Sequence, residues 1–461
     1  MNRNTIVIRR SPVVSRVQAI LGVILTLFIV SESWAIGGAN IGNEALSARS
    51  LGQGAVGIAA ENDDPATVYS NPAGMTRLMG TQATHGGTWE NLHGNYTSAA
   101  GASSKMRSID VGVPNFAFTQ NLIDGKLGVG LGVESPYGLE THWQDGPLRF
   151  VATNSRIHLV DVTPGVAYQV IPMMSVGFGA DYFNTFDASL EKHINVDDVN
   201  TSLGAPTAGS PEAVSRLSGS ATNWGYHAGI TFKPSEQHSF GLAYHSKVKL
   251  TVNGTASITG LSGASALVFG GSNYATSAFT DIFLPQNIQF GYAFKPNDKW
   301  MFEADTAWYD WWSGRELNVR YAETDPTRLA VLNSGNPEPL TQRDAWSFAT
   351  GANYKATEAL QVRGGFWYEP WAMPESTFTP ALLDLSRYGL TAGVGYAFTP
   401  HIGVDLAYNA IFFHTRHITN TLGLTSTGDP RSDISGQYTD FANLVSLNLT
   451  FKFGGKQHQS S

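Results

Sequence analysis

The chain has 461 residues, of which 14% are charged and 42% are hydrophobic, and its formal net charge is -8 at pH 7. A soluble domain usually carries about 25% charged residues, so few charges with a modest hydrophobic fraction indicate alternation of polar and apolar residues. The acidic balance argues against a basic nucleic-acid-binding surface. The absence of cysteine excludes disulfides, thiolate metal sites and a cysteine nucleophile.

The first 35 residues have the pattern of a cleavable secretory signal. A basic stretch precedes an apolar run at residues 19–30, and Ser33, Trp34 and Ala35 follow. A retained membrane anchor is the weaker interpretation, because the run is shorter than the roughly 20 residues that a spanning helix needs. We predict cleavage after Ala35. No later stretch is apolar for long enough to span as a helix, so a mature membrane protein must cross as strands.

Residues 36–78 are rich in glycine and alanine and do not alternate. We predict that they form a hatch that plugs a barrel formed by the residues after them; the alternative is a disordered periplasmic arm. The segment contains Asn71, Pro72 and Ala73. Proline fixes φ and asparagine turns or caps the chain, so these residues form a rigid corner, with or without a gating role.

Residues 79–453 repeatedly alternate apolar and polar residues, and turn residues separate the runs. The clearest hairpin joins residues 288–294 to residues 300–308 through Pro296, Asn297 and Asp298. We count roughly 14 such runs and predict an all-β fold, a transmembrane antiparallel β-barrel. Residues 454–461 form a polar C-terminal tail, which we interpret as a periplasmic extension.

The connections between the runs alternate between short and long. Short turns are predicted to be periplasmic, and long connections extracellular. The predicted long connections are residues 187–223, 253–285, 313–343, 369–387 and 414–441. Four tryptophans are interpreted as an interfacial girdle: Trp311, Trp312, Trp367 and Trp371.

The long connections are more apolar than exposed loops usually are. Such clusters often bind hydrophobic ligands, although here the residues could instead pack the loops against one another. The candidate binding residues are Leu261, Leu267, Val268, Phe269 and Phe283. No nucleophile, cofactor motif or metal-ligand spacing stands out, so we predict neither an enzyme, nor a cofactor, nor a metal site. The alternatives from other classes are an outer-membrane hydrolase and an open porin for polar solutes.

Several short motifs occur together in a specific order on this frame. They are Ser50 to Gly54, Asn71-Pro72-Ala73, Val113-Pro114-Asn115, Tyr137-Gly138-Leu139, Asn223-Trp224-Gly225, Leu284-Pro285 and Arg343-Asp344-Ala345. With these motifs the chain resembles the FadL/TodX family of outer-membrane transporters over essentially its whole mature length. The resemblance implies uptake of hydrophobic compounds into a Gram-negative cell. Long-chain fatty acids are the first expected substrates, and aromatic hydrocarbons are the alternative.

The resemblance also implies roles for individual residues. Asn71, Pro72 and Ala73 would belong to the hatch inside a fourteen-stranded barrel. Pro136, Tyr137 and Gly138 would form a kink in the third strand that opens the wall sideways, whereas the residues alone favour the start of an extracellular loop. The family's cations for a carboxylate headgroup do not match cleanly; the nearest candidates are Lys192, Arg315 and Arg320. The expected partners are hydrophobic small molecules, outer-membrane lipid and lipopolysaccharide, and the expected state is a monomer.

Overall fold

The computed structural model describes residues 46–59, 63–143, 146–420 and 433–454. The predicted signal peptide, residues 36–45 of the predicted hatch and residues 455–461 of the predicted tail lie outside the described residues. None of the helices in the described part of the chain has the length and apolarity needed to cross a membrane.

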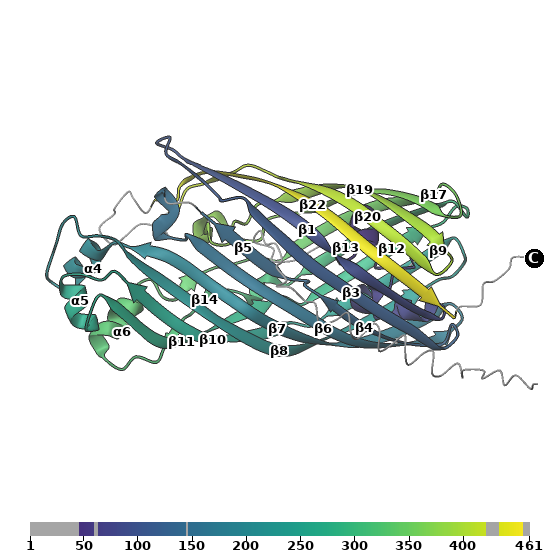
Figure 1. Cartoon of the computed structure of the whole chain (residues 1–461), viewed down its shortest axis with the longest axis horizontal. Helices are drawn as coiled ribbons and strands as arrows, with labels where there is room; N and C mark the ends of the chain where they lie inside the picture. The colour runs from purple at the N-terminus through teal and green to yellow at the C-terminus, as the bar shows by residue number, and fades with distance from the viewer. Residues whose placement is uncertain (1–45, 60–62, 144–145, 421–432, 455–461) are drawn as a thin grey trace, which may run out of the picture.

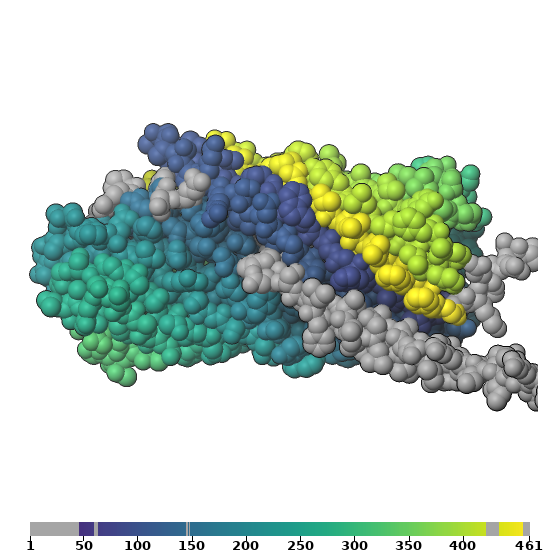
Figure 2. Space-filling view, in the orientation of Figure 1, coloured from purple at the N-terminus to yellow at the C-terminus, as the bar shows by residue number. Residues whose placement is uncertain are grey.

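The strands form a closed antiparallel barrel, inclined to its long axis (Figure 1). The barrel closes where β1 (Thr81–Ser98) pairs with β22 (Gly436–Phe453), and these strands run side by side on the surface in Figure 2. From β1 the wall continues through β3 (Ile109–Ile123), β4 (Leu127–Glu134) followed by β5 (Gly138–His142), β6 (Asn154–Ile171), β7 (Met174–Ile194), β8 (Ala213–Phe232), β9 (His238–His245) followed by β10 (Val248–Thr259), β11 (Asn273–Leu284) followed by β12 (Asn287–Phe294), β13 (Trp300–Tyr309), β17 (Ala345–Lys355), β18 (Leu360–Glu369), β19 (Arg387–Thr399) and β20 (Ile402–Phe413).

Three positions around this wall each hold two consecutive strands, so the described wall has 14 positions, as predicted. Apolar and polar side chains alternate along the strands, with apolar side chains facing outward as expected. Outward side chains such as Phe290 and Phe302 are 45% and 42% exposed, whereas Glu303 and Asp305 of β13 face the interior. The apolar face therefore meets the lipid and the polar face meets the lumen.

The prediction of long loops at residues 187–223 and 253–285 was wrong. β7 and β8 continue to Ile194 and from Ala213, and β10 and β11 likewise extend beyond the predicted strand ends. The inward residues of these extensions, such as Ala256 and Ile258, are buried, so cross-strand packing continues beyond the predicted loop boundary. Only residues 195–212 and 260–272 connect the strands. They carry α4 (Val196–Ser202) and α5 (Ala264–Phe269), which lie at one end of the barrel (Figure 1).

The other connections contain short elements. These are β2 (Ser103–Lys105), η2 (Pro147–Phe150), η3 (Trp311–Ser313), β14 (Glu316–Leu317), β15 (Arg320–Tyr321), α6 (Pro326–Leu332), β16 (Glu338–Pro339), η4 (Glu375–Thr377) and β21 (Arg416–Ile418).

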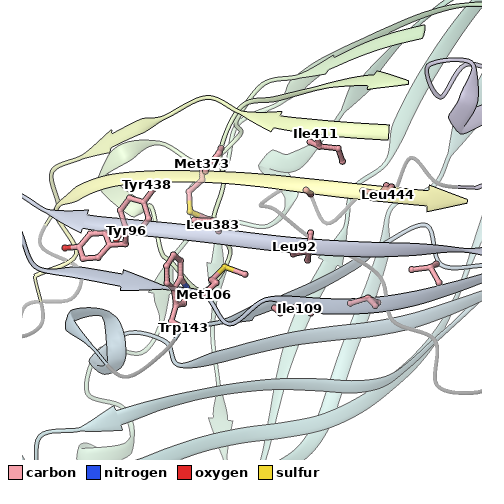
Figure 3. Close-up of a cluster of buried hydrophobic side chains, with 14 of the residues drawn as sticks. Leu92, Tyr96, Met106, Ile109, Trp143, Met373, Leu383, Ile411, Tyr438 and Leu444 are labelled. Atoms are coloured by element: carbon pink, nitrogen blue, oxygen red, sulfur yellow. The ribbon is translucent and has the colours of Figure 1, made fainter. Parts of the chain in front are cut away.

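The largest apolar cluster lies inside the barrel, whose predicted extracellular end we call the upper end. Side chains from β1, β20 and β22, among them Tyr96, Ile411 and Leu444, belong to one cluster with Met373 and Leu383 of the connection between β18 and β19, and Figure 3 labels these residues. This connection therefore folds into the barrel and closes part of its upper end.

Candidate functional site: lumen, hatch and wall break

The described part of residues 46–78 lies inside the barrel. Its helix α2 (Ala48–Gly52) contacts β19, β20 and β22, while η1 (Pro72–Arg77) contacts β6, β7 and β8. Between them, α3 (Thr67–Ser70) packs against β6 and β4. Because one short segment meets the wall on opposite sides, it occupies the lumen, in agreement with the expected hatch position.

Asn71, Pro72 and Ala73 form the expected corner. The Asn71 amide donates to the carbonyl oxygens of Ile58 at 2.7 Å and of Ile230 in β8 at 3.2 Å, and its Oδ1 accepts the N–H of Ala73 at 3.3 Å. Asn71 thus caps η1 and joins two parts of the hatch to the wall.

Carboxylates of the wall bind the hatch backbone. Asp305 accepts the N–H groups of Gly57 at 2.8 Å and Ile58 at 3.1 Å, and Glu303 accepts the N–H of Ala59 at 2.9 Å. These bonds satisfy backbone groups that have no regular secondary structure. The hatch is therefore held by polar contacts in addition to the buried apolar side chains that pack it against the wall.

The third wall position is interrupted at the predicted residues. Glu134 of β4 pairs with Asp161, and Gly138 of β5 pairs with His158. From Glu134 to Gly138 the chain of β4 and β5 advances by four residues, whereas the paired stretch of β6, from Asp161 to His158, advances by three. The third strand of the wall therefore carries one extra residue in the stretch that contains Pro136.

The extra residue separates β5 from β3. β3 pairs with β4 only from Phe116 onward, and in the described residues the rest of that edge, 109–115, pairs with β1 alone. β5 pairs with β6, and the next contact across the gap is the bridge between Met106 and Trp143. The strand pairing of the wall is thus missing between residues 109–115 of β3 and residues 138–142 of β5, at the position expected for Pro136, Tyr137 and Gly138, and we call this unpaired stretch the window.

An apolar cavity of about 170 Å³ lies at the extracellular end. We call it the upper cavity. It is lined by strand residues such as Leu139, Leu190 and Ile282, and by Trp311 and Leu382 from the connections. The girdle prediction was therefore wrong for Trp311, which is 4% exposed, and also for Trp367, which is 3% exposed inside the wall. The identity of an aromatic residue does not reveal which face of the wall it occupies.

A second cavity of about 140 Å³, the lower cavity, lies between the hatch and the wall. Hatch residues such as Ile58 and Tyr69 form one side, and Pro136 and Tyr137 of the break form part of the other. Since Leu139 lines the upper cavity, the interrupted strand borders both spaces.

Most of the predicted loop residues do not line either cavity. Leu261 and Phe269 are 4% exposed and pack with Val268 in a cluster that joins the loops of α4 and α5. Leu267 is 85% exposed, and only Phe283 of the five lines the upper cavity. For this group the alternative of loop-to-loop packing describes the structure better.

The three predicted cations do not line the upper cavity either. Lys192 and Arg315 are exposed, and Arg320 pairs with Asp281 at 2.6 Å. The cation that lines it is Arg156 of β6, which pairs with Asp187 at 3.0 Å. The sequence analysis missed Arg156 because its inward orientation depends on the register of β6.

The connections above the upper cavity are joined by an ion pair. Arg149 of η2 donates to Glu212 at 2.7 Å, and His193 of β7 contacts the same carboxylate at 2.7 Å. The hydrogen bond from Arg149 is the largest effect on the pKa of Glu212 and lowers it; burial opposes this, the hydrogen bond from His193 adds to the lowering, and the pKa falls to about 2. The ionised carboxylate thus holds two connections together.

The periplasmic end contains a polar cavity of about 690 Å³. Its lining includes Arg49, Asp63, Lys233, Lys295 and Lys452. This end differs chemically from the upper cavity, where apolar side chains predominate.

Comparisons with known proteins agree with this architecture. Residues 29–453 match the family model described as outer membrane protein transport protein (OMPP1/FadL/TodX). Outer membrane protein P1 of Haemophilus influenzae is 25% identical over 91% of this chain and 97% of its own. The long-chain fatty acid transport protein of Escherichia coli O6:H1 is 22% identical over 86% of this chain and 90% of its own.

Solved structures show the same fold. A Pseudomonas aeruginosa FadL homologue superposes with a TM-score of 0.77 at 20% identity, covering 91% of this chain and all of its own. The P. putida toluene transporter TodX gives 0.66 at 18% identity, covering 90% of this chain and all of its own. The expected outer-membrane location is confirmed.

Proposed function

Because the chain belongs to the OMPP1/FadL/TodX family of outer-membrane transport proteins, we propose that it takes up hydrophobic small molecules passively, with long-chain fatty acids as the first substrates. A molecule binds in the upper cavity, enters the lower cavity when the hatch shifts, and leaves through the window between β3 and β5. The observation that carries the proposal is that residues 136–139 border both cavities and the window.

Apolar burial supplies enough free energy for capture. Each buried CH₂ contributes roughly 0.8 kcal/mol, so an alkyl chain of twelve carbons gains on the order of 10 kcal/mol before the entropy of binding is subtracted. Specific polar contacts are therefore unnecessary. Fatty acids come first because several curated relatives are named long-chain fatty acid transport protein.

Uncharged aromatic hydrocarbons are the second candidate. The upper cavity, at about 170 Å³, is close in size to an apolar cavity of about 150 Å³ that binds benzene in another protein. Its charged lining residues are Arg156, which is already paired, and the acids Asp281, Glu316 and Glu338. This balance does not favour a carboxylate headgroup, whereas it leaves a neutral hydrocarbon unaffected.

Uptake of labelled oleate and labelled toluene by intact cells tests the proposal. Cells that express the protein should accumulate oleate faster than cells in which it is deleted. Faster uptake of toluene alone would select the second candidate. Equal rates with and without the protein, for both compounds, would refute the proposed function and leave the fold unaffected.

Deletion of Pro136 tests the exit route. The deletion removes the extra residue, so Glu134 to Gly138 could pair with Asp161 to His158 step for step, and Leu139 would keep its inward face. β5 could then close against β3, and uptake should fall to the level of the deleted strain. Pro136→Ala keeps the extra residue and should retain uptake. Normal transport by a folded deletion variant would rule out this exit.

A further inference from the structure

A belt of inward-facing ionisable side chains crosses five neighbouring positions of the wall beside the hatch. All five are between 0% and 4% exposed. Glu134 is the register partner of Asp161, and His227 is the register partner of His245. Asp181 lies between these pairs. The belt is Glu134 of β4, Asp161 of β6, Asp181 of β7, His227 of β8 and His245 of β9.

The two histidines of the belt bind the hatch backbone. His227 Nε2 lies 2.8 Å from the carbonyl oxygen of Val68, and His245 forms a hydrogen bond to the backbone of Ser70. A carbonyl oxygen can only accept, so Nε2 of His227 carries a hydrogen. A ring nitrogen that donates to a carbonyl is the usual partner arrangement of a metal-ligating histidine, because it fixes the tautomer and orients the other nitrogen.

The other nitrogen of His227 faces a carboxylate. Its Nδ1 lies 2.6 Å from Asp181 Oδ1, which also accepts the Thr163 hydroxyl at 2.7 Å. With Nε2 already protonated, Nδ1 and the carboxylate oxygen would both present lone pairs. A positive charge must therefore be shared by these atoms, as either a proton or a metal cation.

A proton shared by His227 and Asp181 would leave other buried polar atoms of the belt without a hydrogen-bond partner. His245 Nε2 and Glu134 Oε1 are buried without a hydrogen-bond partner. Asp161 and Asp181 add negative charge within electrostatic range of Glu134, and no Lys or Arg ion pair to these three carboxylates occurs among the described residues. Buried carboxylates without compensation are strongly unfavourable.

We propose that Asp181, His227 and His245 bind a divalent first-row transition-metal ion, with Glu134 and Asp161 as additional carboxylates. The donor atoms of the three residues lie within 4.8 Å of one another. Two donor atoms with bonds of about 2.1 Å to one ion are at most roughly 4.2 Å apart. The donor atoms would therefore have to approach one another by under about 1 Å to bind the same ion. Imidazole with carboxylate favours ions such as Zn²⁺ over Mg²⁺ or Ca²⁺.

The position gives such an ion a structural consequence. Val68 and Ser70 immediately precede the Asn71 to Ala73 corner, and Glu134 immediately precedes the break. The ion thus joins the hatch to the wall at the point where both border the lower cavity. The sequence analysis predicted no metal site, and a cluster whose donors come from separate strands leaves no ligand spacing in the sequence.

Metal titration of the untagged full chain in detergent, after treatment with EDTA, tests the proposal. The wild type should bind one equivalent of Zn²⁺ at micromolar concentration, and Co²⁺ should give a visible absorption band at the same stoichiometry. Asp181→Asn and His245→Gln should each weaken binding at least tenfold. His238→Gln is the matched control. His238 lies on β9 an odd number of residues from His245, so its side chain lies on the opposite face of the strand, where it contacts Tyr292.

Heat-modifiable electrophoretic mobility shows that each variant has folded, and thermal unfolding gives a second readout. Saturating Zn²⁺ should raise the melting temperature of the wild type and of His238→Gln, but not of His245→Gln. Absence of Zn²⁺ binding by the wild type would overturn the proposal and leave a proton shared between His227 and Asp181. Undiminished binding by both Asp181→Asn and His245→Gln would overturn it as well.

Discussion

The position of the hatch depends on a wall residue that has no side chain, Gly229 of β8. A Cβ added there would overlap Asn71 Oδ1 and lie 3.0 Å from Pro72 Cδ. β8 is paired on both sides, to β7 and to β9, so the wall cannot retreat. The substitution Gly229→Ala should therefore displace the Asn71 corner and leave the barrel intact.

The size of the effect follows from the bonds that Asn71 loses. Its amide donates to the carbonyl oxygens of Ile58 and Ile230, and each bond contributes about 1 kcal/mol net. Loss of both destabilises the seated hatch by about 2 kcal/mol. Because 1.4 kcal/mol is a tenfold change in an equilibrium constant, the displaced population should rise roughly 30-fold.

Conductance across planar lipid bilayers measures this population. Channels with Gly229→Ala should open on the order of 30 times more often than wild-type channels. Gly364→Ala is the control, because the nearest atom to its added Cβ is Thr391 O at 3.6 Å, an ordinary contact. If the two variants conducted alike, the Asn71 corner would not hold the obstruction in the lumen.

Two further substitutions test the cavity and the loop ion pair. Ile282→Asp places a charge in the upper cavity and should lower uptake at least tenfold. Leu267→Asp is the control and should not lower uptake, because this side chain is 85% exposed. Equal uptake by the two variants would contradict the assigned cavity. The pKa of Glu212 is lowered from 4.5 to about 2, so its stabilising pair with Arg149 is complete above pH 4.5 and is lost as the pH falls toward 2. The protection of backbone amides in the connections against hydrogen exchange, relative to their intrinsic exchange rates at each pH, should therefore fall between pH 5 and pH 2.5 in the wild type. Glu212→Gln should lack this change; an identical change in both proteins would show that another group is responsible.

The barrel could be predicted from sequence because its signal is local. Outward residues such as Phe290 and Tyr292 recur at every second position, and this period alone defines the strand and its faces. The same rule identifies an error in the girdle prediction. Phe366 is 40% exposed, so its neighbour Trp367 must point inward, and the structure buries it. Whether a residue lies at an odd or an even position along a strand therefore predicts the face of the wall that it occupies better than the type of residue does.

The site was harder to predict because it depends on register between strands. A proline and a glycine mark the break, but its extra residue becomes visible only when Glu134 is aligned with Asp161 and Gly138 with His158. His227 and His245 meet in the same way. The short turn of the β8–β9 hairpin pairs Phe232 with Phe240, and this register brings the two histidines opposite each other. A reading of hairpin register would have found that pair.

The proposed sideways exit also follows from the chemistry of the two ends of the lumen. β4 has eight residues, which at about 3.4 Å each and a tilt near 40° rise roughly 21 Å from the periplasmic turn, so the break that follows β4 begins near the outer edge of an apolar band about 25 Å tall. In the proposed route, a substrate would meet hydrocarbon at the lower edge of the window. The alternative exit passes the periplasmic cavity, where Arg49, Asp63 and Lys452 face the lumen. Each CH₂ that enters water there costs about 0.8 kcal/mol, so a chain of eight is disfavoured by roughly 6 kcal/mol relative to lipid. The hatch need only uncover the lower cavity, because a substrate that leaves sideways never has to pass the polar contacts below it.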